Sequence, residues 1–204
     1  MKILAISCSP RKNGNTVAMI EEVLHGARGK NAETELFSVS GKNLQPCDGC
    51  WTCTSSGECH INDDMKDLHD RMVEADGIVF GTPVYFYGMT AQVKTILDRS
   101  MPLGHPDRNL TSKVAGVVVN CGSLGLVDVL KDLSYYIIQR KMIPANQVSA
   151  YIASPDDLKN MEQCTKALHT LGEQMVALAE TGFKYPSEYS EYMVRGIAYG
   201  THTK

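Results

Sequence analysis

Four cysteines lie close together in one short stretch of the chain. They have the spacing C-x2-C-x2-C-x5-C and occupy Cys47, Cys50, Cys53 and Cys59. Thiolates this close in sequence converge only if the backbone curls tightly around one object, and a loop wrapped around a cubane iron–sulfur cluster has that shape. The spacing therefore predicts a [4Fe–4S] cluster held by these residues.

Other chemistries of the four thiols remain open. Structural zinc sites usually take two ligands from one short knuckle and two from a distant one, because four thiolates on one small loop strain the tetrahedron. Disulfides are disfavoured, since the chain has no export signal and cytosolic thiols stay reduced. Free or redox-active thiols are the remaining alternative. Three further cysteines lie outside the loop; Cys8 and Cys121 are expected to pack, and Cys164 has no assigned role.

Two other side chains of the loop, Trp51 and His60, lie next to the cysteines in sequence. Trp51 lies between two cysteines and is expected to shield a cluster from water, which would shift its potential. His60 follows the last cysteine, but four thiolates already satisfy a cube. We therefore expect His60 to lie beside the cluster or in solvent. The same is expected of the other histidines, which are His25, His69, His105, His169 and His202.

A polar loop follows the first apolar segment of the chain. If a strand ends there and a helix begins, backbone N–H groups and the positive helix end converge on one point, which favours a phosphate. The candidate phosphate ligands are Ser9, Arg11, Asn13, Gly14, Asn15 and Thr16. The loop matches neither the P-loop nor the dinucleotide-binding pattern, so a phosphate monoester fits better. The alternative is a polar turn in which Thr16 only caps the helix.

Two later loops could hold a flat ring beside this phosphate. In the first, a proline stiffens the backbone, a glycine lets it turn, and aromatic residues lie between them. Its candidates are Pro83, Val84, Tyr85, Phe86, Tyr87 and Gly88. The second loop offers small residues for close backbone contact, namely Asn120, Gly122 and Ser123. A monophosphate and a flat ring together imply FMN, although the aromatic residues could also be simple packing residues.

The elements that would position these loops alternate between strands and helices. Most strand candidates are continuous apolar runs, typical of strands covered on both faces. They are Lys2–Ser7, Glu33–Val39, Gly77–Thr82, Val114–Asn120 and Gln147–Ile152. The helices are expected at Thr16–Ala27, Asp64–Glu74, Thr90–Arg99, Leu126–Arg140 and Asp157–Glu180. This pattern predicts an α/β fold with a doubly wound five-stranded parallel sheet in the order 2-1-3-4-5, whose ligand lies at the carboxyl ends of the strands.

Length and charge limit the domain number and the partners. With 204 residues, the chain favours one α/β domain over two small ones. We expect a domain at 1–184, with the cysteine loop at 43–62, and a tail at 185–204 that packs on a neighbouring subunit through Tyr185, Tyr189, Tyr192 and Tyr199. A net charge of -3 argues against nucleic acid or an anionic membrane as partner. The missing export signal predicts a cytoplasmic protein.

At residues 1 to 185 the chain resembles the iron–sulfur flavoproteins of the flavodoxin-like NADPH-dependent FMN reductase group. The resemblance is carried by S-P-R-x-x-G-N-T at 9–16, the four cysteines, Asp63-Asp64-Met65, T-P-V-Y at 82–85 and K-x-x-x-D-R at 94–99. The cysteine spacing is its specific part, because many related flavin or quinone reductases lack one or more of these cysteines.

The resemblance implies FMN, a [4Fe–4S] cluster on the four cysteines and a homodimer or homotetramer. The implied activity is electron transfer from a donor such as ferredoxin or NAD(P)H to a small-molecule acceptor. It also implies that Lys94, Asp98 and Arg99 lie near a subunit interface, with a solvated helix face as the alternative. Two other functions remain open: an NAD(P)H-dependent FMN, quinone or azo reductase without a functional cluster, and a redox sensor.

Overall fold

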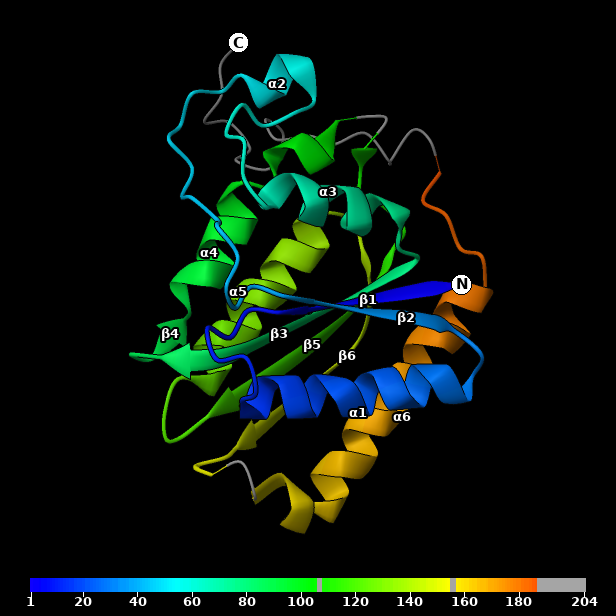
Figure 1. Ribbon diagram of the computed structural model, residues 1–204. Coiled ribbons are helices and arrows are strands. Elements are labelled where there is room, and N and C mark those ends of the chain that lie inside the picture. Colours follow the sequence, from blue (N-terminus) through cyan, green and yellow to red (C-terminus); the bar gives the residue numbers. More distant parts are fainter. Residues whose placement is uncertain (106–107, 155–156, 187–204) are drawn as a thin grey trace.

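The computed structural model describes residues 1–105, 108–154 and 157–186 (Figure 1). Its centre is a parallel sheet in the order β2-β1-β3-β5-β6, with the short β4 paired antiparallel to the end of β3. The strands are β1 Lys2–Ser7, β2 Glu33–Ser38, β3 Gly77–Tyr85, β4 Gly88–Met89, β5 Val114–Cys121 and β6 Ile143–Tyr151. Because β4 takes a number of its own, this order is the predicted 2-1-3-4-5, and the doubly wound fold is confirmed.

Helices cover both faces of the sheet. In Figure 1, α1 and α6 lie on one face, and α3, α4 and α5 lie on the other. The helices are α1 Asn15–Gly29, α2 Cys53–Ser56, α3 Met65–Glu74, α4 Ala91–Asp98, α5 Leu126–Gln139 and α6 Glu162–Glu180, with 3-10 turns at Met101–Gly104 and Asp157–Asn160. Among the described helices, none is long and apolar enough to cross a membrane.

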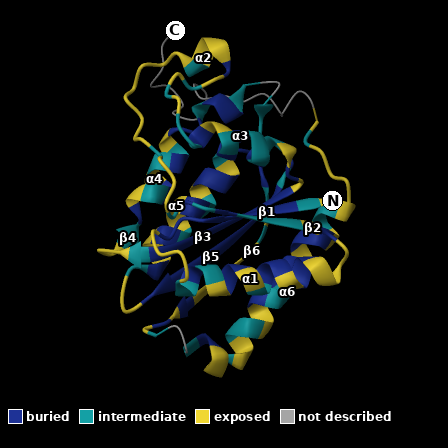
Figure 2. Cartoon of the chain, viewed as in Figure 1, coloured by how far each residue is buried: buried dark blue, intermediate teal, exposed yellow. Residues whose placement is uncertain are grey.

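The sheet separates two apolar cores, because successive strand residues point to opposite faces. On β1, Ile3 and Ala5 pack with residues of α1 and α6, whereas Leu4 and Ile6 pack with residues of α3, α4 and α5. Figure 2 shows the central strands almost wholly buried. Burial on both faces explains why these strands are continuous apolar runs.

The structure extends two strands beyond the predicted bounds. β3 was expected to end at Thr82 but runs to Tyr85 and forms a hairpin with β4. β6 was expected to begin at Gln147 but begins at Ile143. It pairs only with β5, so it is an edge strand, where Pro144 is tolerated although it cannot donate a hydrogen bond.

The helices at two places also differ from the prediction. The last helix, expected from Asp157, is interrupted after the 3-10 turn and resumes at Glu162. The short helix α2 inside the cysteine loop was not predicted. Four residues carry too little pattern to be read as a helix from sequence.

Candidate functional site

The loop between β1 and α1 is fixed to the neighbouring strand. The Cys8 N–H donates to Gly81 O at 2.8 Å, and Thr90 Oγ1 donates to Cys8 O at 3.1 Å. Ser9 is buried, and its hydroxyl accepts a hydrogen bond from the Arg11 N–H at 3.2 Å. The start of this loop therefore has a defined position at the carboxyl edge of the sheet. Burial raises the pKa of Cys8 to about 12, so this thiol is inert at neutral pH.

The N-terminus of α1 leaves backbone donors free. Its N-cap is Gly14, which offers no side-chain hydrogen bond, so the first-turn N–H groups lack an intrahelical acceptor. The side-chain oxygen of Asn15 is buried without a hydrogen-bond partner in the described part of the chain. The free N–H groups at this helix N-terminus fit a phosphate, whereas the Asn15 oxygen is an acceptor and adds nothing to that fit. Of the other candidates here, Arg11 and Asn13 are exposed.

Thr16 is not the cap of this helix, which corrects the alternative of a simple polar turn. Its hydroxyl is buried and donates to Asn120 Oδ1 at 2.6 Å. Asn120 ends the parallel part of β5 that pairs with β3, so this bond joins two loops that are far apart in sequence. The structure thus brings together two of the loops predicted to bind one ligand.

The β3–β4 hairpin presents the aromatic candidates to solvent. Phe86 is 97% exposed, Tyr87 59% and Tyr85 43%. They are therefore not core packing residues of this chain, which was the alternative interpretation. Pro83 is buried and pairs with Asn120 in the sheet register. The flat and exposed rings remain available to a heteroaromatic ligand or to another protein surface.

The loop after β5 lies against the tip of the hairpin. A Cβ atom on Gly125 would lie 2.7 Å from Tyr87 O, and this glycine has a φ of 98°. The Cys121 thiol accepts from the Ser123 N–H at 3.1 Å and donates to Leu124 O at 2.9 Å, so it shapes this loop. Gly122 and Ser123 are exposed. All three predicted loops thus belong to the same edge of the sheet.

The cysteine loop, residues 43–62, curls through unusual backbone conformations. Gly49, Trp51 and Gly57 have φ values of 73°, 61° and 69°. A positive φ is uncommon outside glycine, so Trp51 holds a sparsely populated conformation. Its side chain is 65% exposed in this chain, where we had expected it to cover a cluster.

The four thiols of the loop are free and influence one another. Burial raises the pKa of Cys53, and the negative charges of Cys59, Cys50 and Cys47 raise it further. A bound cation would offset this effect and favour the thiolate of Cys53.

The spacing of the sulfur atoms bears on the binding of a single zinc ion. Thiolates on tetrahedral zinc lie about 2.3 Å from the metal, and hence about 3.8 Å from one another. No three of these four sulfur atoms, all within the described chain, lie within 4.8 Å of one another. The four thiols alone therefore form no compact site for one zinc ion in this chain.

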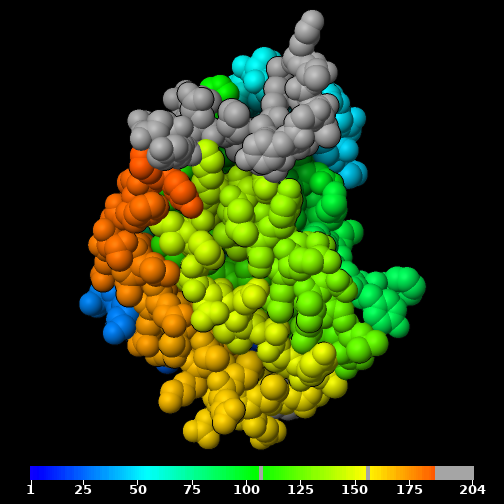
Figure 3. Space-filling view, turned by 180° about the vertical axis from the view of Figure 1, so that it is seen from behind, coloured from blue at the N-terminus to red at the C-terminus, as the bar shows by residue number. Residues whose placement is uncertain are grey.

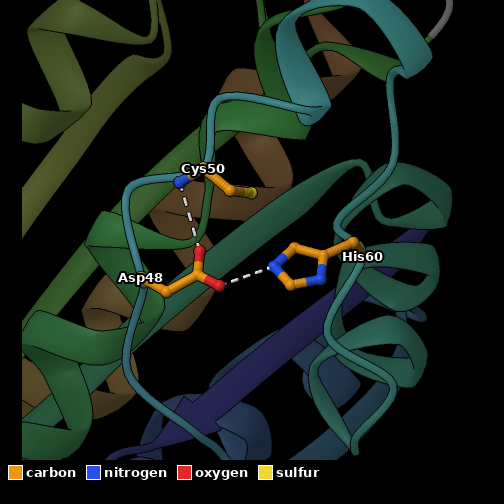
Figure 4. A group of neighbouring side chains, drawn as sticks. All are labelled: Asp48, Cys50 and His60. Carbon is orange, nitrogen blue, oxygen red and sulfur yellow. Dashed lines mark hydrogen bonds and ion pairs between the residues drawn. The ribbon is translucent and has the colours of Figure 1, made fainter.

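A smaller contact group lies inside the same loop (Figure 4). Asp48 accepts from the Cys50 N–H at 3.2 Å and bonds His60 Nε2 at 2.7 Å. Asp48, Cys50 and His60 are all exposed, and in the described chain only they form a group of three close ligand atoms suited to one metal ion. The carboxylate thus connects the two halves of the loop. His60 pairs with it and is not simply free in solvent.

The structure rules out one alternative interpretation near the loop and places one histidine beside it. Arg99 does not lie on a solvated helix face, because it is 2% exposed and forms an ion pair with Asp63. Lys94 and Asp98 do face solvent, where they pair with each other at 2.5 Å. His69 is buried and lines a small cavity together with Cys59, so of the two expected places it lies beside the cysteine loop and not in solvent. Helical spacing alone did not reveal either burial, since both depend on where the cysteine loop lies.

The remaining predicted positions are partly outside the described residues. His202, Tyr189, Tyr192 and Tyr199 lie outside them. The beginning of the tail packs on its own domain, since the Tyr185 N–H donates to Ser112 Oγ at 2.9 Å. The other histidines lie near the surface, and His25 and His169 contact each other edge to face with ring centroids 5.1 Å apart.

The cysteine loop and the three sheet-edge loops lie apart within one chain. In Figure 1 the chain leaves the carboxyl edge after β2, rises past α4 and reaches α2 at the top, whereas the hairpin with β4 projects at the side. Figure 3 shows the same separation from behind, with the hairpin projecting from the surface. A single chain therefore presents two candidate redox sites on different parts of its surface.

Comparisons with solved structures support the fold. The chain superposes on a flavodoxin from the domain Archaea with a TM-score of 0.60 and 16% identity, covering 88% of this chain and 99% of that one. It also superposes on an NAD(P)H:quinone oxidoreductase from Methanothermobacter marburgensis with a TM-score of 0.65 and 14% identity, covering 85% and 98%. At these identities the likeness establishes a flavodoxin-like fold.

Sequence comparisons establish the family. Residues 1–155 match the family described as NADPH-dependent FMN reductase. An iron–sulfur flavoprotein from Methanocaldococcus jannaschii is 34% identical over 190 residues, which cover 88% of this chain and 98% of that protein. An iron–sulfur flavoprotein from Archaeoglobus fulgidus is 30% identical over 188 residues, covering 87% and 95%. This chain therefore belongs to the iron–sulfur flavoproteins within the NADPH-dependent FMN reductase family, and it is a flavin-dependent oxidoreductase.

Proposed function

We propose that this protein passes electrons between a one-electron donor, such as ferredoxin, and a small two-electron acceptor. The observation that carries the proposal is the open group of four free thiols on one loop of a flavodoxin-like chain. When bound, an iron–sulfur cluster supplies single-electron transfer, and FMN supplies transfer of one or two electrons. A protein that holds both can join the two kinds of partner.

The flavin would be held at the carboxyl edge of the sheet. The backbone N–H groups at the N-terminus of α1, with the Ser9 hydroxyl and the side-chain NH2 of Asn15, would supply donors for its phosphate. Thr16 and Asn120 hold the two flanking loops together. The exposed hairpin from Tyr85 to Gly88 supplies flat side chains for its ring. The chain's task there is to bind and orient, which requires no acid–base triad.

The cluster would be held by Cys47, Cys50, Cys53 and Cys59. Two of these thiols are exposed and two are half-buried, so an external donor can approach the loop. Cysteine ligation requires reduced thiols, which is consistent with a reducing compartment such as the cytoplasm.

Electrons would cross between subunits. The cysteine loop and the hairpin lie apart in one chain (Figures 1 and 3), and in the proposed homodimer or homotetramer the loop of one chain would lie beside the hairpin of another. The exposed aromatic side chains of Phe86 and Tyr87 suit such a contact, since aromatic residues are enriched at interfaces.

An NAD(P)H-dependent FMN, quinone or azo reductase without a functional cluster is the second candidate. The family's description as an NADPH-dependent FMN reductase favours it. So does the contact group of Asp48, Cys50 and His60, whose ligand atoms lie within 4.8 Å of one another and suit a single zinc ion.

Anaerobic purification followed by iron, sulfide, zinc and FMN analysis separates the two candidates. We expect about four iron and four sulfide per chain, together with FMN. Reduced ferredoxin should then reduce the flavin faster than NAD(P)H does. Cys50→Ala should lose the iron, whereas Cys164→Ala, outside the loop, should retain it. Stoichiometric zinc without sulfide would overturn the proposal.

A further inference from the structure

Arg99 follows the last residue of α4, and its guanidinium reaches into the base of the cysteine loop. Nη1 donates to Asp63 Oδ2 at 2.5 Å and to Gln45 O at 3.0 Å. Nη2 donates to Ile61 O at 3.2 Å and to Cys59 Sγ at 3.4 Å. One side chain from a helix of the main domain therefore bonds both ends of the loop and one of its thiols.

The two ends of the loop are also joined to each other. Asp63 Oδ2 accepts from the Gln45 N–H at 2.8 Å, and Asp64 Oδ2 accepts from the Asn43 N–H at 2.7 Å. The Asp64 N–H in turn donates to Asn43 O at 3.1 Å. These bonds form a closed neck from which the loop with the four cysteines emerges. Arg99 crosses that neck, since it binds Asp63 and Gln45 together.

The chemistry of this contact differs from that of an ordinary surface ion pair. The side chains of Arg99 and Asp63 are both fully buried, whereas Lys94 and Asp98 on the same helix pair in solvent and do not touch the loop. A planar guanidinium holds several acceptors in fixed directions, which an ammonium group cannot do. The neck thus needs an arginine at this position for its geometry.

One donor of Arg99 remains unused. The Nε–H is buried and has no hydrogen-bond partner in the described part of the chain. A buried unpaired donor is costly, by about 1–3 kcal/mol for a typical group. An acceptor at this edge of the guanidinium would satisfy it. This orphan donor is a second observation, independent of the bond to Cys59, that points to a ligand at the neck.

We propose that Arg99 is a positioning residue for the cluster: it fixes Cys59 as the fourth ligand and raises the reduction potential through its hydrogen bond to the Cys59 sulfur. The proposal rests on the proposed function, because it requires that the loop holds an iron–sulfur cluster. A reduced cluster carries one more negative charge than the oxidised one, so donors and a cation at its sulfur atoms stabilise the reduced form.

The test compares Arg99→Gln and Arg99→Lys with the unaltered protein in anaerobic redox titrations of cluster and flavin. The cluster potential should become more negative in Arg99→Gln and shift less in Arg99→Lys, which keeps the charge. The FMN potential should not change. Arg108→Gln is the matched control, because Arg108 lines the cavity beside Cys59 but pairs with Asp70 and Glu58 and not with the Cys59 sulfur. It should shift the cluster potential less than Arg99→Gln does.

A second measurement on cluster-free protein tests the positioning alone. Amide hydrogen exchange across residues 43–64 should become at least tenfold faster in Arg99→Gln and change much less in Arg108→Gln, which loses only the ion pair to Glu58 in this loop. If Arg99→Gln assembles no cluster, the positioning of Cys59 is supported and Arg99→Lys reports the potential. An unchanged cluster potential and unchanged exchange in Arg99→Gln would overturn the inference while leaving the proposed function intact. Absence of iron and sulfide from the unaltered protein would instead overturn the proposed function and, with it, the effect on the potential.

Discussion

Among the single-residue contacts, the buried hydrogen bond from Thr16 to Asn120 holds two candidate ligand-binding loops together. Thr16→Val keeps the branched shape but leaves Asn120 Oδ1 buried without its donor. We expect the free energy of unfolding to fall by about 1–3 kcal/mol and FMN affinity to fall about tenfold. Urea unfolding and flavin titration measure the two effects. Unchanged FMN affinity would show that this bond does not organise the flavin site.

His69 provides a pH-dependent prediction at the same scale. Burial, together with the charges of Arg99 and Arg108, lowers its pKa from 6.5 to about 4. Because the folded state binds this proton less readily than the unfolded state, stability is complete above pH 6.5 and is lost as the pH falls toward 4. The loss has an upper limit of about 3 kcal/mol.

The measurement is the urea unfolding midpoint of cluster-free protein between pH 7 and pH 4, with His69→Gln as the comparison. Cluster-free protein is used so that the charge of a bound cluster does not affect the unfolding midpoint. His69→Gln should lose less stability across this range than the unaltered protein does, because it has no proton to gain. Parallel pH profiles for the two proteins would contradict the burial of a neutral histidine at this position.

At the scale of elements, the β3–β4 hairpin depends on one glycine in the loop after β5. Gly125→Ala would bring a Cβ atom to 2.7 Å from Tyr87 O, at a φ of 98° that alanine rarely adopts. We expect a loss of stability on the order of 2 kcal/mol and weaker FMN binding, because the hairpin tip must move. Gly29→Ala is the control, since a Cβ atom there meets nothing within 4 Å. Equal unfolding midpoints for the two variants would show that the hairpin can move without a loss of stability.

The helices and strands also show how much of the fold can be predicted from the sequence. The sheet order was predictable because long apolar runs alternate with helical patterns, and chain connectivity then limits the topology. The hairpin was missed because Phe86 and Tyr87, with φ values of 47° and 66°, occupy positions that usually carry asparagine and glycine. Pro144 hid the start of β6, since prolines are rare in strands other than edge strands.

The candidate site, too, was only partly predictable from the sequence. The spacing of residues close in sequence predicted that the four cysteines share one site and that the loop before α1 forms another. The comparisons confirm the family that these residues suggested. The buried positions of Arg99 and His69 could not be predicted, because each depends on the path of the cysteine loop over α3 and α4. The signal for Arg99 was present in the D-D-M and K-x-x-x-D-R patterns, which the structure brings together through the ion pair to Asp63.

At the scale of the whole molecule, the separation of the two sites leads to a prediction about assembly. If electrons cross between subunits, one chain needs only its cluster and its partner needs only its flavin. Cys50→Ala should remove the cluster and keep FMN, since no residue of the α1 loop is touched. Asn15→Asp should remove FMN and keep the cluster, because it puts a negative charge at the phosphate site beside the N-terminus of α1.

Mixed dimers of these two variants should therefore recover transfer from reduced ferredoxin to FMN, although neither variant transfers electrons alone. Recovery is expected to approach half of the activity per chain, because each mixed dimer has one cluster facing one flavin across the contact. Stopped-flow absorbance of the flavin measures the rate after the subunits have been exchanged and the mixed species isolated. Equal mixtures without subunit exchange are the control. If isolated mixed dimers show no transfer while a dimer of one unaltered and one doubly substituted chain does, electrons move within a chain, and the path runs from α2 past α4 to the sheet edge.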